Sequence, residues 1–578
     1  MVEVVNRLTQ RHATIEVAAP WVAGLVLAAP ALVAFYPPMT DLAFHEAAIG
    51  ILRHFGDTAM FPPGLYRYNL GEPNQLFHMA GWALSYVVST RWAVKLIVAA
   101  AVALVPVSAA RFARHVGASP LAGLVVAPMA LGWLFSWGLV ANVIGLAALL
   151  ATLPLLDRLA QDPTPRRALA AMGGALFLYF AHEAMLFVYG GAALGLALLH
   201  RGSPRQTALR ISPMVGGAAI AVAQMRWQKR FMTPAVRGMP VFWHTPWHKL
   251  KRIPYLVMPA GDPFAHAAMF SLCLLALGTF LWLRTRERRA SSPVPPAGAT
   301  LRERPRAWIL ARRWEAFALA CFVAYMAFPL TLGGATLVYQ RWFPPAFAVL
   351  AVVLAPADLW VRSARVTRLA VGVLPLATLL VAWPSFADSS RQYRALEAII
   401  AHVQPGSAVA SVDLGPGDPS RNYSLGPAAG RVLAERGGRL VYAFTDSPVS
   451  PVVVARRYQW NESLVRVGFD SWAFRPAHDL KRFRYLLLRT TDPVRVWIAT
   501  YALADEAEYV TEEGEWVLYR SRLPVAPLTS PDWPLEKPPP PSMREKLSDV
   551  ARKLKESMQS APDVEVPPEP TEDRAPPM

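Results

Sequence analysis

Cysteine is almost absent from this chain of 578 residues: only Cys273 and Cys321 occur, and both fall within apolar runs. Two cysteines in such surroundings exclude a disulfide framework and a cysteine metal site. Charge is also scarce, because charged residues make up 17% of the chain while 54% of residues are hydrophobic. This composition excludes a single soluble domain and predicts a polytopic membrane protein.

Acidic residues are outnumbered by basic ones, 40 against 58, which gives a net charge of +18. In a soluble protein such an excess would favour nucleic acid as a partner. Here most basic residues lie in short connections between apolar runs, where Lys and Arg are retained on the inner side of the membrane. The excess therefore indicates topology, and we expect no nucleic-acid partner. The abundance of Ala, Arg and Pro is typical of a bacterial chain.

Apolar runs of membrane-spanning length fill the first two thirds of the chain. A bilayer needs about 20 helical residues, and about 17 is a practical lower limit. The run at 168–199 could be one long helix or two short ones broken at residues 181–183. Counted as two, the sequence predicts about eleven transmembrane helices, near 18–36, 92–110, 118–136, 138–156, 168–181, 184–199, 208–225, 264–283, 314–332, 342–358 and 367–384.

Positive charge decides how the run at 168–199 is divided. A single helix there would place the connection 284–313, which carries nine arginines, outside the cell. Because Arg in short loops stays inside, the charge bias favours two short helices. The N-terminus is then cytoplasmic, and so are five arginine-bearing connections: 111–115, 157–167, 200–207, 284–313 and 359–366.

The first outer loop, residues 37–86, is too polar to cross a bilayer and too aromatic and apolar to be a free linker. If Asp41 begins a helix, His45 lies one turn further on the same side. The carboxylate of Asp41 then lies near the positive end of the helix dipole. We expect this helix to lie at the membrane surface.

The C-terminal part of the chain changes character. Residues 385–523 lose the long apolar runs and alternate short helix-like and strand-like pieces, which predicts a small extracytoplasmic α/β domain. Gly437 and Gly438 predict a helix stop just before one of the strand-like pieces. Residues 524–578 are Pro-rich and are expected to be disordered, apart from a helix with a capping box at Ser542 and Glu545. The predicted fold class is an all-α polytopic membrane domain over 1–384, with a long first outer loop, followed by this domain and tail.

Polar residues gather on the expected outer face in the first loop, at the break between the two short helices, in the basic loop 226–263 and before the tenth crossing. Ionisable groups kept near membrane depth usually face a water-filled cavity or a partner. Carboxylates there could act as a base or hold a divalent metal, and Arg or Lys could hold a phosphate. The candidates are Asp41, His45, Glu46, His182, Glu183, Lys229, Arg230, Tyr339 and Arg341.

The candidates also have plainer structural interpretations. Asp41 could simply cap the loop helix. His45 could be packed rather than bound to metal, because no set of three or four zinc ligands at a recognisable spacing is visible. His182 and Glu183 could form a polar turn between two short helices. Lys229 and Arg230 could meet lipid headgroups, and Arg341 could make a structural salt bridge.

Three motifs carry a resemblance to a known superfamily: residues 40–46 (TDLAFHE), 68–73 (YNLGEP) and 339–342 (YQRW). With the predicted topology, they make residues 1–384 resemble the GT-C class of membrane glycosyltransferases, which includes protein O-mannosyltransferases and aminoarabinose transferases. The resemblance implies a first-loop acidic residue that acts as base or metal ligand, here Asp41. It also implies an Arg or Lys for the lipid-linked phosphate, here Arg341. The second acidic site of many members would fall on Glu183.

The leading hypothesis is an enzyme of the bacterial inner membrane that moves a sugar from a polyprenyl-phosphate carrier to an extracytoplasmic acceptor. Asp41 would deprotonate the acceptor or bind Mg²⁺ or Mn²⁺, and Arg341 with Lys229 or Arg230 would neutralise the leaving phosphate. The expected partners are the lipid-linked donor, membrane lipids and an acceptor. One alternative is a non-catalytic envelope protein whose outer domain binds partners. A transporter is the other, although internal repeats, its usual sign, are not visible.

Overall fold

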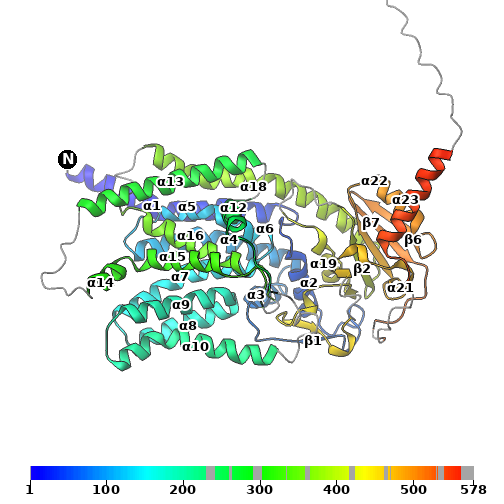
Figure 1. Cartoon of the computed structure of the whole chain (residues 1–578), viewed down its shortest axis with the longest axis horizontal. Helices are drawn as coiled ribbons and strands as arrows, with labels where there is room; N and C mark the ends of the chain where they lie inside the picture. Colours follow the sequence, from blue (N-terminus) through cyan, green and yellow to red (C-terminus); the bar gives the residue numbers. More distant parts are fainter. Residues whose placement is uncertain are drawn as a thin grey trace, which may run out of the picture.

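The fold combines a bundle of long helices with a mixed α/β unit at one end of the bundle (Figure 1). It is given by a computed structural model. The N-terminus lies at the end of the bundle that is distant from the α/β unit (Figure 1). The structure describes residues 2–228, 241–259, 263–290, 303–332, 335–357, 359, 365–415, 423–460, 467–468, 470–528, 530 and 539–560.

The helices of the bundle are mostly apolar, as predicted. They are α1 (Val2–Val33), α4 (Thr90–His115), α7 (Val140–Gln161), α8 (Pro165–Ala181), α9 (Glu183–Leu199), α10 (Pro204–Gln228), α13 (Pro263–Ala290), α14 (Glu303–Ala311), α15 (Arg313–Ala327), α16 (Phe343–Leu354) and α18 (Arg365–Ile400). By length and composition, five helical segments in the described part of the chain can cross a membrane: Thr14–Val33, Thr90–His115, Val140–Gln161, Pro263–Glu287 and Thr367–Ile400. Several crossings are therefore supported, but the predicted count of eleven is not confirmed.

Two predicted crossings show how single residues break a helix. The run 168–199 divides at His182, whose extended backbone (φ −167°, ψ 122°) separates α8 from α9, so the prediction of two short helices is confirmed. The run 118–136 is also broken, because Pro128 begins a 3₁₀ turn and Gly132 is extended. It forms three short buried pieces: α5 (Ala122–Val126), η1 (Ala127–Leu131) and α6 (Trp133–Ser136).

Arginines tie several helix connections together at the end of the bundle distant from the α/β unit. Asp157 bonds His115 at 2.9 Å and Arg313 at 2.7 Å. Arg210 donates to the carbonyl of Ala160, and Arg306 donates to that of Leu199. Four of the connections predicted to share the cytoplasmic side thus meet at one end: 111–115, 157–167, 200–207 and 284–313.

Helix α18 leads from the bundle into the α/β unit and continues without a break past residue 384, where the sequence predicted a domain boundary. The unit holds a five-stranded sheet in the order β3-β2-β5-β7-β6, parallel between β3, β2 and β5 and antiparallel from β5 to β6. The predicted helix stop is present, because Gly437 and Gly438 have positive φ angles of 68° and 77°. The strands are β2 (Ala408–Asp413), β3 (Arg439–Leu440), β5 (Tyr485–Arg489), β6 (Ala507–Glu513) and β7 (Trp516–Ser521).

The first loop is folded between the bundle and the α/β unit. It contains α2 (Leu42–Arg53), β1 (Tyr66–Tyr68) and α3 (Leu76–Leu84), and β1 pairs antiparallel with β4 (Val452–Val454). Helix α2 begins after Asp41, as predicted, but almost all of its residues are buried. It packs against α19 (Gly430–Arg436), so protein covers it, and its place at the membrane surface stays a prediction (Figure 1).

The helix predicted near residue 542 is α23 (Met543–Ser560), and it starts with the expected capping box. The backbone N–H of Ser542 donates to Glu545 at 2.6 Å, and the N–H of Glu545 donates back to the Ser542 hydroxyl at 3.4 Å. Met543 is fully buried, so the first turn of α23 packs on the α/β unit beside α22 (Pro493–Ala502). This part of the predicted tail is ordered because it covers apolar surface.

Candidate functional site

Asp41 lies at the N-terminus of α2, but its side chain makes no capping hydrogen bond, so the capping interpretation is wrong. The backbone holds it instead: the N–H of Asp41 donates to the carbonyl of Trp137 at 3.3 Å, and Thr40 donates to that of Ser136 at 2.9 Å. Gly138, with φ 77°, lies so close that a Cβ would fall 2.4 Å from the Asp41 nitrogen. Burial raises the pKa of the Asp41 carboxyl to about 7, a value suited to a general base near neutral pH.

His45 and His78 form a buried pair next to Asp41. The Nδ1 of His45 lies 2.9 Å from the Nε2 of His78 on α3, and the ring of His45 also bonds the carbonyl of Gly138. Burial lowers the pKa of both rings, to about 4 for His78, so both are neutral near pH 7. The buried Nδ1 of His78 has no hydrogen-bond partner among the described residues.

Glu46 faces away from this pair and is fully buried. Its carboxylate accepts from the hydroxyl of Tyr36 at 2.9 Å and from that of Thr90 at 3.0 Å, and it forms an ion pair with Arg431 on α19. These partners occupy both carboxylate oxygens. The structure thus places Glu46 in the contact between the first loop and the α/β unit, and it does not bring Glu46 to Asp41.

A second cluster forms where the break at His182 meets η2 (Tyr339–Trp342). His182 is buried and accepts from the N–H of Ala184 at 3.1 Å, so it caps α9. Burial and then the charge of Arg341 lower the pKa of His182. Burial also lowers the pKa of Arg341, and the negative charge of Glu183 offsets part of that effect. Within the described chain, Arg341 makes no ion pair, and its Nε is buried without a hydrogen-bond partner. The structural salt bridge considered for Arg341 is therefore not found there.

Tyr339 is buried and directed away from Arg341, its neighbour but one in the sequence. Its hydroxyl lies 3.0 Å from Nδ1 of His244, and the ammonium of Lys249 lies 4.6 Å from the centre of its ring. Lys249, on α12 (Pro246–Val257), donates to the carbonyls of Met326 and Phe328. Tyr339 thus anchors η2. Two further candidates, Lys229 and Arg230, lie outside the described residues.

Helix α7 and one loop connect the two clusters. Gly138, just before α7, touches Asp41, and a Cβ on Gly145 would fall 2.7 Å from the Cβ of His182. Seven residues of helix span about 10 Å. The side-chain oxygen of Asn74 accepts from the N–H of Glu183 at 2.7 Å, and His78 follows one turn later. The structure therefore brings Asp41, His45, His182, Glu183 and Arg341 to the same end of the bundle.

Asp41 is not joined by enough described side chains to make an all-protein metal site. Within the described ranges, no group of three or more His, Cys, Asp and Glu side chains is placed to hold a metal ion. His45 and His78 bond each other, which occupies the nitrogens that would face a shared ligand. A divalent ion at Asp41 would take its other ligands from substrate phosphate and water, so this site stays a prediction, and we derive no step through a metal.

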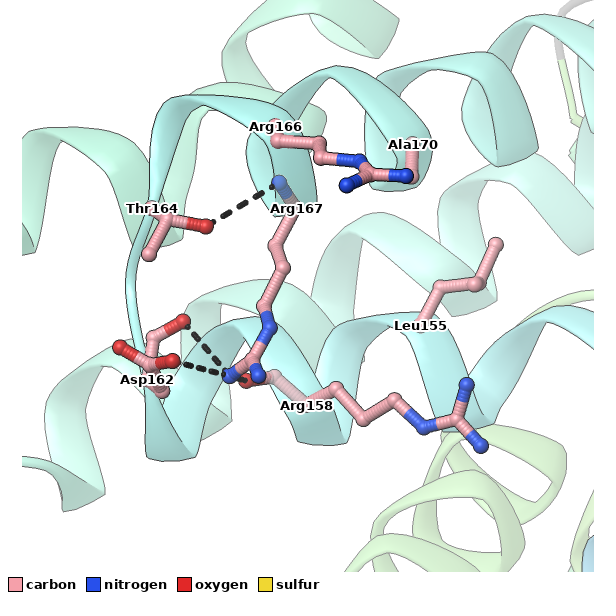
Figure 2. Close-up of a pocket in the computed structure, with 7 residues that line it drawn as sticks. All are labelled: Leu155, Arg158, Asp162, Thr164, Arg166, Arg167 and Ala170. Atoms are coloured by element: carbon pink, nitrogen blue, oxygen red, sulfur yellow. Dashed lines mark hydrogen bonds and ion pairs between the residues drawn. The ribbon is translucent and has the colours of Figure 1, made fainter.

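A surface hollow lies at the opposite end of α7, about 30 Å away along a helix of 22 residues. Figure 2 shows the guanidinium of Arg167 turned toward Asp162, and the two groups pair at 2.7 Å. The hollow lies at the arginine-rich end of the bundle and is not part of the candidate site. It is lined by Leu155, Arg158, Asp162, Thr164, Arg166, Arg167 and Ala170.

Three residues that the sequence did not single out complete these contacts: His78, Asn74 and Arg431. A histidine inside the apolar run after residue 75 was a local signal that could have identified His78. Asn74 has a positive φ of 65°, a conformation that Asn tolerates better than most residues. Arg431 lies 385 residues from Glu46, and nothing local to either residue indicates the pair.

The fold defines a multi-pass membrane protein with a GT-C-like architecture. No protein-family model matches the chain, and no curated protein matches it significantly in sequence. The crystal structure of ArnT from Cupriavidus metallidurans in the apo state matches with a TM-score of 0.50 and 13% identity, over 91% of this chain and 100% of that chain. The structure of ArnT from the same organism bound to undecaprenyl phosphate matches with the same TM-score and identity, over 90% and 99%. At this identity the likeness shows the fold.

Proposed function

We propose that this protein is a glycosyltransferase that moves a sugar from a polyprenyl-phosphate carrier to an acceptor outside the cytoplasm of a bacterium. The GT-C-like fold supports this proposal, and one of the matching ArnT structures holds undecaprenyl phosphate. For such a reaction the protein would lie in the inner membrane with its N-terminus in the cytoplasm and with the first loop and the α/β unit on the outer side. The sugar and the acceptor stay open.

The observation that carries the proposal is the guanidinium of Arg341: among the described residues its buried Nε has no hydrogen-bond partner, and it interacts electrostatically with Glu183 without forming an ion pair. A buried charge without a close partner costs free energy, and an anionic ligand removes that cost. A phosphate accepts paired hydrogen bonds from a guanidinium with good geometry. Arg341 is therefore the residue to hold the phosphate of the lipid carrier.

Asp41 serves as the general base in this proposal. Its carboxylate removes a proton from the nucleophilic group of the acceptor, which then bonds to the anomeric carbon of the sugar. The bond between that carbon and the phosphate oxygen breaks, the electron pair leaves with the lipid phosphate, and Arg341 stabilises the resulting charge. The contact of Gly138 with Asp41 and that of Gly145 with His182 lie about 10 Å apart along the chain that leads into α7, and we place the reacting sugar in this region.

The direct test is binding of undecaprenyl phosphate to the purified full-length protein in nanodiscs. We expect saturable binding, and competition by inorganic phosphate only at much higher concentration, because the lipid chain adds apolar contacts. Undecaprenol, which has no phosphate, is the matched control and should bind at least about 10-fold more weakly. Equal binding of the two lipids, or binding of neither, would contradict the proposal and favour a non-catalytic envelope protein.

The raised pKa of the Asp41 carboxyl predicts that the stability of the folded protein depends on pH. Its pKa is about 7 in the folded protein, against an ordinary value of 3.8, so the folded state becomes less stable as pH rises from about 4 through 7. Asp41→Asn removes this cost, which is at most about 4 kcal/mol at 1.36 kcal/mol per pKa unit. We expect the melting temperature of the variant to exceed that of wild type at pH 8 by more than at pH 5.

The matched control for this stability measurement is Asp162→Asn, because the side chain of Asp162 is 60% exposed and pairs with Arg167 at the protein surface. Its difference from wild type should stay small at both pH values, since exposed ion pairs contribute little. A difference for Asp41→Asn that does not change between pH 5 and pH 8 would mean that the carboxyl of Asp41 titrates in its ordinary range.

A further inference from the structure

Helices α2 and α19 cross at unusually close range, although they come from opposite parts of the chain. A Cβ on Gly430 would lie 2.4 Å from the carbonyl oxygen of Ala43, and a Cβ on Gly50 would lie 3.0 Å from the Cα of Ala434. A side chain at position 430 would therefore clash with the backbone of α2, and one at position 50 would push α19 away slightly. The first loop and the α/β unit meet through a helix pair that leaves almost no freedom for one to shift against the other.

A buried charge lies in this crossing. Arg431 on α19 has a side chain that is 1% exposed, and it pairs with Glu46 of α2, which is not exposed at all. The same guanidinium bonds Glu397 of α18 at 2.9 Å and Glu435 at 2.7 Å. One side chain therefore joins the first loop, the helix that leaves the membrane bundle and the α/β unit.

The position of Asp41 depends on this crossing. Asp41 lies immediately before α2, five residues ahead of Glu46, and its own side chain makes no hydrogen bond that holds the helix start. A buried ion pair tolerates displacement poorly, because separation leaves an uncompensated charge in a medium of low polarity. Any shift of α2 that moved the carboxyl of Asp41 would separate Glu46 from Arg431.

We infer that Glu46 and Arg431 are positioning residues that act through α2 to hold the carboxyl of Asp41 in place for transfer. This inference rests on the proposed function, and it assigns Glu46 a role that does not touch substrate. It also makes the α/β unit part of the catalytic apparatus, because α19 supplies one half of the pair.

The test compares two buried arginines of the same unit. Arg489 is matched to Arg431, since its side chain is 4% exposed and pairs with Asp413 at 2.9 Å and Glu515 at 2.7 Å, but it joins strands of the sheet and does not bond α2. Transfer is measured as release of undecaprenyl phosphate from a panel of undecaprenyl-phosphate sugars. Arg431→Gln should lower kcat about 100-fold with KM for the lipid donor unchanged, because small misplacements of a catalytic group have effects of this size. Arg489→Gln, at a similar loss of melting temperature, should leave kcat within about 3-fold.

A double variant separates positioning from direct catalysis. Glu46→Gln with Arg431→Gln leaves no unpaired buried charge on α2, and the other two partners of Arg431, Glu397 and Glu435, are each 37% exposed and can be solvated. We expect its kcat to recover at least about 10-fold over that of Arg431→Gln alone. No recovery would indicate that Glu46 acts on the substrate and would overturn the inference, and so would equal effects of Arg431→Gln and Arg489→Gln on kcat.

Hydrogen exchange tests the contact between Glu46 and Arg431 without a transfer assay. Arg431→Gln should speed exchange in residues 42–53 relative to wild type, and Arg489→Gln should leave that segment protected. If wild type releases no lipid phosphate but this difference in exchange is seen, the contact is as inferred and the proposed function fails. If exchange in residues 42–53 is the same in both variants, the inference fails whatever the activity.

Discussion

Replacing Asp41 by Asn is expected to lower transfer about 1,000-fold while leaving expression and lipid binding intact. Proton transfer by a positioned side chain contributes about 10²–10⁴-fold to rate, and Asn has almost the same shape but cannot accept the proton. Burial already raises the pKa of Asp41 to about 7, so the carboxylate is basic enough to serve near neutral pH. In wild type, kcat should therefore rise with pH through about 7 and then level off.

The measurement is release of undecaprenyl phosphate by purified protein across pH 5.5 to 8.5. The control is Asp57→Asn, which alters another Asp of the first loop; among the described residues its side chain accepts from the N–H of Ala59 at 3.0 Å. Its pH profile should match that of wild type. Full activity of Asp41→Asn would exclude Asp41 as the base, and a profile that is flat across pH 7 would show that its ionisation does not govern the rate.

Replacing Arg341 by Gln is expected to weaken binding of undecaprenyl phosphate about 100-fold. Loss of one partner from a buried charged pair costs about 2–5 kcal/mol, and 1.4 kcal/mol corresponds to a factor of ten. Arg341→Lys keeps the charge but not the paired geometry, so it should recover only part of the affinity. The melting temperature should not fall, because Arg341 has no ion pair in the described part of the chain.

Binding of labelled undecaprenyl phosphate in nanodiscs measures this effect. Arg167→Gln, in the hollow at the arginine-rich end of the bundle (Figure 2), is the control for general loss of positive charge. It should leave affinity within about 3-fold of wild type, the range of surface substitutions. Equal losses for Arg341→Gln and Arg167→Gln would mean that the lipid phosphate responds to overall charge and has no specific site at Arg341.

Local signals account for the parts of the fold that the sequence predicted. The helix after Asp41, the break at His182, the capping box at Ser542 and the helix stop at Gly437 each depend on residues within one turn of the feature. The short extended segments of the α/β unit were recognisable for the same reason. Such features survive folding because the backbone preferences that create them do not need distant partners.

Long-range contacts account for what the sequence did not predict. Periodicity showed that α2 is a helix, but the distant α19 is needed to explain why nearly every face of α2 is buried and what pairs with Glu46. The pairing of β1 with β4 is equally remote. The breaks in the run at 118–136 have local causes, Pro128 and Gly132, but the high hydropathy of the run led to the prediction of one continuous helix.

The distance along the chain between Glu46 and Arg431 also sets an order of events during biogenesis. Glu46 is translated 385 residues before its partner, which at about 5–20 residues per second is a delay of about 20–80 s. During that interval the newly exported first loop cannot adopt its final packing, and the carboxylate of Glu46, which is buried in the folded protein, is still exposed to water. A chain that stops before residue 430 would insert its helices yet never mature the segment that carries Asp41, so quality-control proteases should remove it.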